Sequence, residues 1–233
     1  MAICGADGCK KGWVAVYKDL GTGDVTWSLR RTANELVYSR PIPQVIALDI
    51  PSGLTEIGAR GCDLEARRLL GQCRASSVFP APIRPVLEAA SYAEACHLRF
   101  QAECKKMSRQ AWGITAKIKD VDEALRHDYS LQERVREVHP EVSFYFLAGE
   151  RPMQDNKKGK AGRKERFRLL EPVFGRWLSR ALEERSGLAS AEDDVLDAFA
   201  ALWTAERIVS GIARTIPKTP PADAFGPRME ITA

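Results

Sequence analysis

The pattern of hydrophobic and polar positions changes several times along the chain. Two short apolar stretches, residues 2–7 and 12–18, flank a tight turn, and a third stretch at 24–29 follows a second glycine-containing turn. Short apolar runs separated by such turns are typical of antiparallel strands. A short helix at 32–38 precedes a continuous apolar run at 44–51, which indicates a strand buried on both faces. This order predicts an α/β fold with a mixed sheet.

Residues 54–130 follow a different pattern, which is mainly helical. Two helical stretches, 62–71 and 91–107, flank the proline-rich segment 76–87, which has no regular period and is expected to be an ordered loop. The second stretch opens with a Ser91-x-x-Glu94 capping box. We interpret 54–130 as a helical insertion on the sheet and not as a separate domain.

The last hundred residues return to alternating elements. Residues 133–144 resemble a further strand that ends at Pro140, and the basic segment 157–170 is expected to be an exposed loop that enters a helix. A long helix is predicted from Ser190 or Ala191 to about Ser210, with Gly211 as its stop. We therefore predict one domain over 1–216 and an irregular, proline-rich tail over 217–233.

Composition and charge narrow the classes of protein that fit this fold. The formal charge of +4 permits an anionic partner without requiring one. No apolar run approaches the roughly 20 residues that cross a membrane. The six cysteines show no Cys-x-x-Cys spacing and the three histidines form no paired zinc motif. The N-terminus has no signal-peptide pattern, so we expect the reducing cytoplasm as the location.

The late helix carries a carboxylate that its amphipathic pattern does not explain. At about 100° per residue, Asp194 falls within the apolar arc in line with Ala198, and Asp197 lies one turn on, at the edge of that arc. The helix dipole favours acidic residues near the N-terminus but does not explain one that points inward. An inward carboxylate needs a cation, a basic partner or a wet cleft.

Three more acids lie at the ends of predicted strands. Asp7 ends the first apolar stretch, and Asp49 lies near the carboxyl end of the buried strand, where open α/β sheets bind ligands. Asp49 has an alternative role as the cap of the turn at 51–53. Glu137 lies among valines before a proline, and its alternative is an edge-strand glutamate paired with a neighbouring arginine.

Together these carboxylates are the ligands that a divalent-cation site needs. Mg²⁺ and Mn²⁺ prefer oxygen ligands and keep several waters. Two such ions can activate water and stabilise the leaving oxygen during phosphodiester hydrolysis. We expect Asp7, Asp49 and Asp194 to hold Mg²⁺ or Mn²⁺, with Asp197 and Glu137 as further catalytic residues.

Motifs spread over about 4–211 resemble one known family. They are, in order, GADGCKKGW, ALDIPSGL, SSVFPAPIR, EVHPEVSF and DDVLDAFAALWTA. The chain resembles domain-of-unknown-function family four hundred and twenty-nine, described as predicted nucleases of the ribonuclease H-like fold. The resemblance implies three antiparallel strands, a helix and further parallel strands. It also implies acids on the first strand, on a central strand end and on a late helix, which Asp7, Asp49 and the Asp194-x-x-Asp197 pair match.

Basic side chains provide candidates for binding a polyanionic substrate. The densest cluster consists of Lys157, Lys158, Lys160, Arg163, Lys164 and Arg166. The expected substrate contacts come from this cluster, from the hairpin turn and from the insertion, and they are Lys10, Lys11, Arg60, Arg67, Lys158 and Arg166. Contacts of this kind bind phosphates with salt-sensitive affinity and without sequence readout. The alternative for each is a solvated surface position.

The favoured function is a metal-dependent nuclease whose partner is a nucleic acid of unspecified type. One alternative is a non-catalytic module that binds nucleic acid or protein. Another is a nucleotide phosphate-binding or phosphotransfer protein, because a turn such as GADGCKKGW can hold phosphates in the duplicated actin-like and sugar-kinase folds. His139 is a candidate proton shuttle, with a structural role as its alternative. The oligomeric state stays open, with a homodimer as one option.

Overall fold

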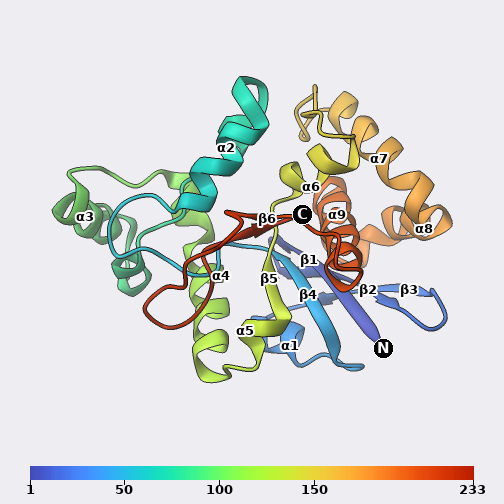
Figure 1. Ribbon diagram of the computed structural model, residues 1–233, viewed down its shortest axis with the longest axis horizontal. Coiled ribbons are helices and arrows are strands. Elements are labelled where there is room, and N and C mark those ends of the chain that lie inside the picture. The colour runs from blue at the N-terminus through green and yellow to red at the C-terminus, as the bar shows by residue number, and fades with distance from the viewer.

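A five-stranded mixed sheet lies at the centre of the protein, which a computed structural model describes over residues 1–233 (Figure 1). The strand order is β3-β2-β1-β4-β5; β1, β2 and β3 are antiparallel, and β4 and β5 run parallel to β1. The strands are β1 (Ala2–Cys9), β2 (Gly12–Asp19), β3 (Val25–Arg30), β4 (Pro43–Asp49) and β5 (Val135–Glu137). The predicted α/β fold with a mixed sheet is confirmed, and it is consistent with the ribonuclease H-like fold.

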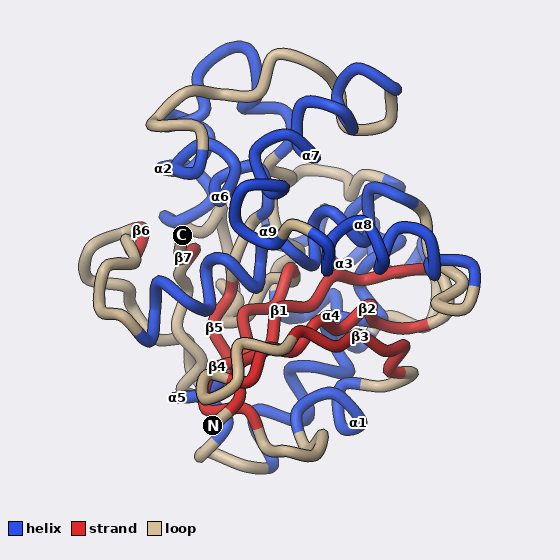
Figure 2. The backbone as a smooth tube through the Cα atoms, turned by 90° about the vertical axis from the view of Figure 1, so that its right-hand side faces the viewer, coloured by secondary structure: helices blue, strands red, loops and turns tan.

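Helices cover both faces of this sheet. They are α1 (Ala33–Val37), α2 (Gly61–Arg74), α3 (Tyr92–Glu103), α4 (Arg109–His127), α5 (Leu131–Arg134), α6 (Pro140–Leu147), α7 (Lys160–Phe174), α8 (Arg176–Glu183) and α9 (Glu192–Val209). Short 3₁₀ turns are η1 (Ala75–Ser77), η2 (Arg84–Glu88) and η3 (Glu184–Ser186). Figure 2 shows the strands between α8 and α9 on one side and α1 on the other. The helices and turns from α2 to α4 correspond to the predicted helical insertion.

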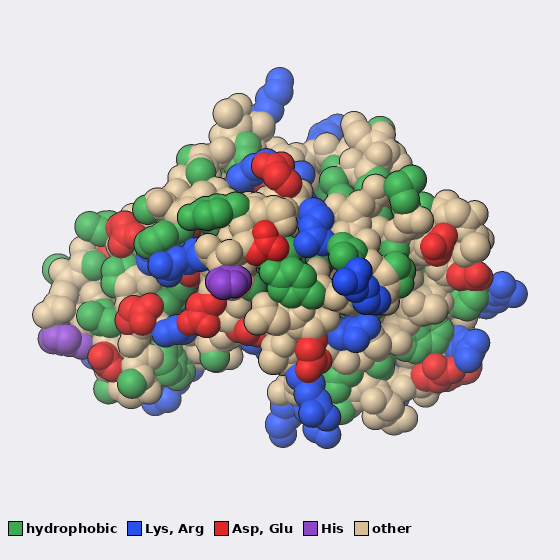
Figure 3. All heavy atoms as spheres, turned by 90° about the horizontal axis from the view of Figure 1, so that it is seen from below, with side chains coloured by type: hydrophobic (Ala, Val, Ile, Leu, Met, Phe, Trp, Pro, Cys, Tyr) green, Lys and Arg blue, Asp and Glu red, His purple; other side chains and the backbone are tan.

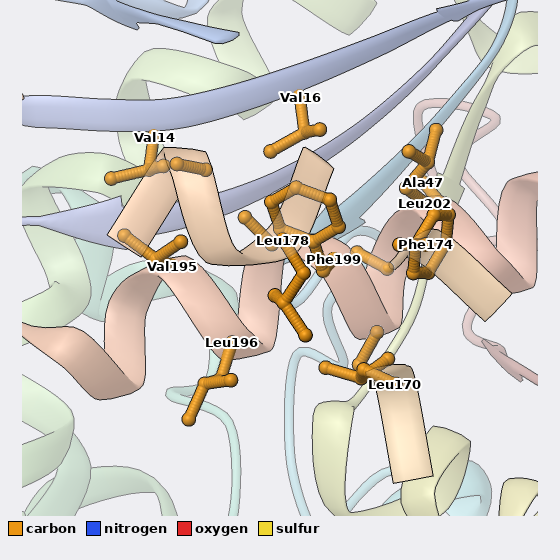
Figure 4. Close-up of a cluster of buried hydrophobic side chains, with 14 of the residues drawn as sticks. Val14, Val16, Ala47, Leu170, Phe174, Leu178, Val195, Leu196, Phe199 and Leu202 are labelled. Atoms are coloured by element: carbon orange, nitrogen blue, oxygen red, sulfur yellow. The ribbon is translucent and has the colours of Figure 1, made fainter. Parts of the chain in front are cut away.

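Side-chain alternation along β1 assigns its residues to two separate cores. Ile3 packs into the core that includes α9, whereas Cys4 and Ala6 pack into the opposite core with α1 and α4. The same alternation on β4 sends Ala47 to α9 and Leu48 to the opposite side. Figure 4 shows the α9 core, in which Val14 and Val16 of β2 face α9.

The long helix α9 lies directly against the backbone of β1. A Cβ atom added at Gly5 would lie 2.0 Å from the Leu202 nitrogen and 2.6 Å from the Ala198 carbonyl oxygen. Only glycine permits this approach, because any side chain would overlap the helix backbone. The contact fixes α9 across the sheet just before the carboxyl end of β1. The predicted stop at Gly211 is also observed, with a φ of 70° after the helix C-cap.

Two predicted boundaries are wrong. Residues 133–144 do not form one strand that ends at Pro140: α5 is followed by the three-residue β5, and Pro140 begins α6. Proline at the first helical position suits a helix start because its missing N–H is not needed there. The tail is not irregular to its end, because β7 (Ile231–Thr232) pairs with β6 (Thr215–Ile216), and Thr232 bridges to Val138 beside β5.

On the side of the protein opposite the carboxyl ends of β1 and β4, positively and negatively charged side chains are mixed and do not form separate patches. Figure 3 shows that face, with Lys, Arg, Asp and Glu side chains interspersed among apolar ones. All six cysteines are unpaired thiols. No helix has both the length and the apolar character needed to cross a lipid bilayer.

Candidate active site

Asp7 and Asp49 lie side by side at the carboxyl ends of two parallel strands. They are direct cross-strand partners of β1 and β4, which places their backbones about 4.8 Å apart. Both continue the alternation that faces α9, since Gly5 on β1 and Ala47 on β4 precede them by two residues. Asp7 is buried and Asp49 is half-buried. The sequence-based placement of these two acids at one edge of the sheet therefore agrees with the structure.

Burial and neighbouring negative charge raise the pKa of both carboxyls above the ordinary value of aspartate. Burial raises the pKa of Asp7 well above its ordinary value, and the negative charges of Asp49 and Asp197 raise it further. Burial also raises the pKa of Asp49, whereas the charges of His139 and Lys157 act in the opposite direction. Cations close to the pair therefore favour its ionised form.

The third carboxylate comes from Asp197, and the expectation that Asp194 points inward is wrong. Asp197 is 1% exposed, whereas Asp194 is half-buried and accepts a hydrogen bond from the Ala191 backbone nitrogen at 2.8 Å, which caps α9. The helix is buried on almost every side by the sheet and by α6, α7 and α8. Its apolar arc is consequently too wide to distinguish one acidic position from the other.

Lys157 is the cation that the three carboxylates share. Its ammonium forms an ion pair with Asp197, which is the largest cause that raises the pKa of Lys157, while burial opposes the shift and Asp7 and Asp49 reinforce it. The neighbouring Lys158, whose side chain is largely exposed, instead forms an ion pair of 2.6 Å with Asp193. Two consecutive lysines thus bind two acids on the first turns of α9.

The segment that carries Lys157 is held by side chains of α7. Glu165 accepts hydrogen bonds from the backbone nitrogens of Gln154 and Asp155, at 2.8 and 3.1 Å. Arg166 donates to the Asp155 carbonyl at 3.1 Å. Arg166, one of the predicted substrate contacts, therefore helps to fix the loop that presents Lys157.

A cleft of about 490 Å³ opens over the Asp7–Asp49 pair. Figure 1 shows α2 and α7 on either side above these strand ends. The insertion contributes one wall, which includes Arg74, Phe79 and Lys117, and residues 156–158 contribute the other. His139 Nε2 lies 3.3 Å from the Ser77 carbonyl and joins the insertion to the sheet, while its predicted proton-shuttle role stays a prediction.

Comparisons with known proteins give this site a family context. A family model described as Protein of unknown function (DUF429) matches residues 5–222. The chain belongs to the DUF429 family. The match includes Asp7, Asp49, Asp197 and the whole insertion, and it confirms the family that the motifs resemble. Neither a curated protein nor a solved structure matches the chain in the two other comparisons.

Glu137 of the DUF429 protein lies outside the cleft, which corrects its expected catalytic role. It is the cross-strand partner of Leu48 and therefore points to the face opposite Asp49. Its carboxylate receives two hydrogen bonds of 2.7 Å from Arg60 and one of 2.6 Å from the Ser52 nitrogen. Arg60 is buried with it, so neither residue is available to a substrate.

Of the other predicted substrate contacts of the DUF429 protein, only Lys158 lines the cleft. Arg166 is fully buried in an ion pair with Glu141, which corrects its expected role as a substrate ligand. Arg67 donates to the Val78 carbonyl at 2.6 Å and supports the insertion. Lys10 and Lys11 are exposed in the β1–β2 turn and do not line the cleft, whereas Lys158 does.

The donor set fits a divalent cation held mainly by two carboxylates. No group of three or more His, Cys, Asp or Glu side chains is arranged to enclose a metal ion, and Asp197 is paired with Lys157. Mg²⁺, however, is commonly bound through one or two carboxylates together with substrate phosphates. Asp197 Oδ1 is also buried without a hydrogen-bond partner. Asp7 and Asp49 thus provide suitable ligands, and Asp197 has one oxygen available.

Sequence reasoning missed the part that Lys157 plays and the presence of Phe79 in the cleft. Lys157 is one of six basic residues in a short segment, and nothing in their spacing indicates which of them reaches an acid of α9. Phe79 lies in a motif whose prolines predict a loop, but not one that lines the cleft. Both positions depend on contacts between segments far apart in the chain.

Proposed function

We propose that this protein is a divalent-cation-dependent nuclease that hydrolyses phosphodiester bonds over the Asp7–Asp49 pair. One observation carries the proposal: the in-register carboxylates of Asp7 and Asp49 line a cleft together with cationic side chains, and the buried Asp197 of α9 lies close enough for its charge to act on Asp7. Carboxylates at this position match what two-metal and one-metal phosphodiesterases need, and the cations suit a phosphate backbone. The six unpaired thiols fit action in the reducing cytoplasm.

In the proposed mechanism the acidic residues of the site bind the metal ion, and the basic residues neutralise the acids or contact the substrate phosphates. Asp7 and Asp49 would hold Mg²⁺ or Mn²⁺, which when bound supplies an acidified water and neutralises charge on the phosphate. Lys157 forms an ion pair with Asp197, and its positive charge reduces the repulsion between the carboxylates. Arg74 and Lys117 donate hydrogen bonds only to backbone carbonyls, at 2.7 and 2.9 Å, and the Lys117 ammonium also lies 5.0 Å from the centre of the Trp13 ring. Neither cation is paired with a carboxylate, so both can contact substrate phosphates.

A cleavage assay with matched variants tests this function. Labelled DNA and RNA, each single-stranded and double-stranded, are incubated with the protein in Mg²⁺, in Mn²⁺ and in a chelator. We expect cleavage of at least one substrate with metal, and its loss in the chelator. The double variant Asp7→Asn/Asp49→Asn should lose at least about 1,000-fold in rate, because it removes both proposed metal-binding carboxylates.

The matched control for that assay is Asp24→Asn, which changes an exposed acid in the β2–β3 turn by the same chemistry. It should cleave at the wild-type rate. Circular dichroism of each variant separates loss of activity from loss of fold. Cleavage that survives in the double variant would contradict the proposed site.

A non-catalytic nucleic-acid-binding module is the second candidate, favoured by one observation. The Lys157 ammonium already neutralises part of the carboxylate cluster, and such a cluster can be stable without a metal. Calorimetric titration with Mg²⁺ and Mn²⁺ separates the two functions. The nuclease requires metal binding that the Asp7→Asn/Asp49→Asn variant loses, whereas the module requires none.

A further inference from the structure

Phe79 places an exposed aromatic ring in a cleft that is otherwise mostly polar. It is the only Phe, Tyr or Trp that lines the cleft, and it is 44% exposed. A single exposed apolar side chain is common on a protein surface, so exposure alone does not indicate a binding site. Phe79 differs from the other exposed rings because it lines the cleft that also contains Asp7 and Asp49, where a ligand can cover it.

The backbone around Phe79 is held firmly on both sides. Val78 is buried, and its carbonyl accepts a hydrogen bond of 2.6 Å from Arg67. On the other side, the Ala81 nitrogen donates to buried Asp63 at 3.1 Å. Pro80 between them restricts the chain further. Phe79 is consequently a fixed platform and not the tip of a flexible loop.

The charge around this platform favours an anionic ligand. Arg74 and Lys117 line the same cleft and form no ion pair with any carboxylate. The cleft volume of about 490 Å³ is in the range of small-molecule sites, so it suits one or a few nucleotides. Paired bases within a duplex have both faces stacked on their neighbours, and only an unpaired base offers a free face to Phe79.

We propose that the substrate enters as a single strand, with one unpaired base stacked on Phe79 and the adjoining phosphates contacted by Arg74 and Lys117. This inference rests on the proposed nuclease function, because it names the substrate form of the same site. Stacking on an aromatic ring tolerates any base, so it selects unpaired strands without selecting sequence. Arg67 and Asp63 act as positioning residues for the platform.

Binding measured in a chelator tests the inference separately from catalysis. The probe is a short fluorescein-labelled single strand of mixed sequence, compared with the same strand annealed to its complement, by fluorescence anisotropy. We expect the single strand to bind more tightly than the duplex. Phe79→Ala should weaken single-strand binding by about 5- to 150-fold, and Phe79→Trp should retain it, because a larger ring still stacks.

Two controls separate stacking from charge and from general damage. Phe100→Ala removes a ring that is 52% exposed on α3 outside the cleft, and it should bind like the wild type. Heparin, a polyanion without bases, should bind the Phe79→Ala and wild-type proteins equally. Equal single-strand affinity of Phe79→Ala and wild type, tighter binding of the duplex, or an equal loss of heparin binding would each overturn the inference.

The outcome stays distinguishable from that of the nuclease proposal. If the metal-dependent cleavage assay fails while Phe79→Ala still weakens strand binding, the platform is real and the protein is a binding module. If cleavage is observed but Phe79→Ala binds and cleaves like the wild type, the nuclease stands and the stacking inference is wrong.

Discussion

Lys157 and Asp197, which lie 40 residues apart in the chain, form an ion pair beside the Asp7–Asp49 pair. The Asp197 carboxylate is almost fully buried, whereas Lys157 is about one-third exposed. Buried carboxylates are costly without a cation, so Lys157 stabilises both Asp197 and the arrangement of the cleft. The pair joins the loop before α7 to the helix α9 at the site itself.

Lys157→Met should therefore destabilise the protein through the carboxylates left without their cation. We expect the free energy of unfolding in urea to fall by about 1 to 3 kcal/mol without metal, and millimolar Mg²⁺ to restore more stability than in the wild type. Lys158→Met, which removes a side chain that is 72% exposed, is the matched control and should change little. Equal stability of the two variants would show that Lys157 does not neutralise the site.

The pH dependence of stability should change when Asp7 is replaced. The pKa of Asp7 is higher in the folded protein than its ordinary value of 3.8, so the folded state binds more protons above that pH. The contribution of Asp7 to stability therefore falls as the pH rises from about 4 toward the folded pKa. Asp7→Asn should raise the melting temperature at neutral pH in a chelator, with the gain disappearing near pH 4.

Asp24→Asn is the control for that experiment and should leave the pH profile unchanged, because Asp24 is exposed. A lower melting temperature of Asp7→Asn at neutral pH would mean that the Asp7 carboxylate is stabilised by its surroundings. That result would contradict the unfavourable burial on which the expected metal binding depends.

Gly5→Ala should loosen the contact that positions Asp197. The added Cβ would overlap the backbone of α9, which cannot move without shifting the whole helix, and we expect a loss of about 3 kcal/mol or more in urea unfolding. Gly113→Ala on α4 is the matched control, because its Cβ meets open space and alanine favours helix by up to about 1 kcal/mol. Equal effects of the two substitutions would refute the close approach.

Glu137→Gln tests whether this residue is structural. Breaking its buried pair with Arg60 should cost about 3 to 5 kcal/mol of unfolding free energy while leaving any cleavage rate per folded molecule unchanged. Glu133→Gln breaks an exposed pair with Arg228 and should cost less than about 1 kcal/mol. Loss of cleavage by a folded Glu137→Gln protein would restore the catalytic role that the structure argues against.

The sheet and two of its acids could be predicted because they depend on local patterns. Short apolar runs and the turns between them located β1 to β4, and Asp7 and Asp49 follow from the position of strand ends. Register with Leu48 turns Glu137 away from Asp49, and a sequence does not show which residues pair across a strand as short as β5.

The remaining parts of the site depend on tertiary packing. Asp194 could not be distinguished from Asp197 because α9 is surrounded by other elements and its burial has no clear direction. The role of Lys157 depends on a loop held by α7, and the exposure of Phe79 depends on how the insertion lies over the sheet. Neither relationship leaves a periodic signal in the sequence.

Anomalous X-ray diffraction from crystals soaked in Mn²⁺ shows whether Asp7 and Asp49 hold a divalent cation. We predict an anomalous peak bridging the carboxylates of Asp7 and Asp49, and no peak there in crystals of the Asp7→Asn/Asp49→Asn variant. Wild-type crystals that show no Mn²⁺ at these carboxylates, with the Lys157–Asp197 pair intact, would mean that Asp7 and Asp49 do not form a metal site.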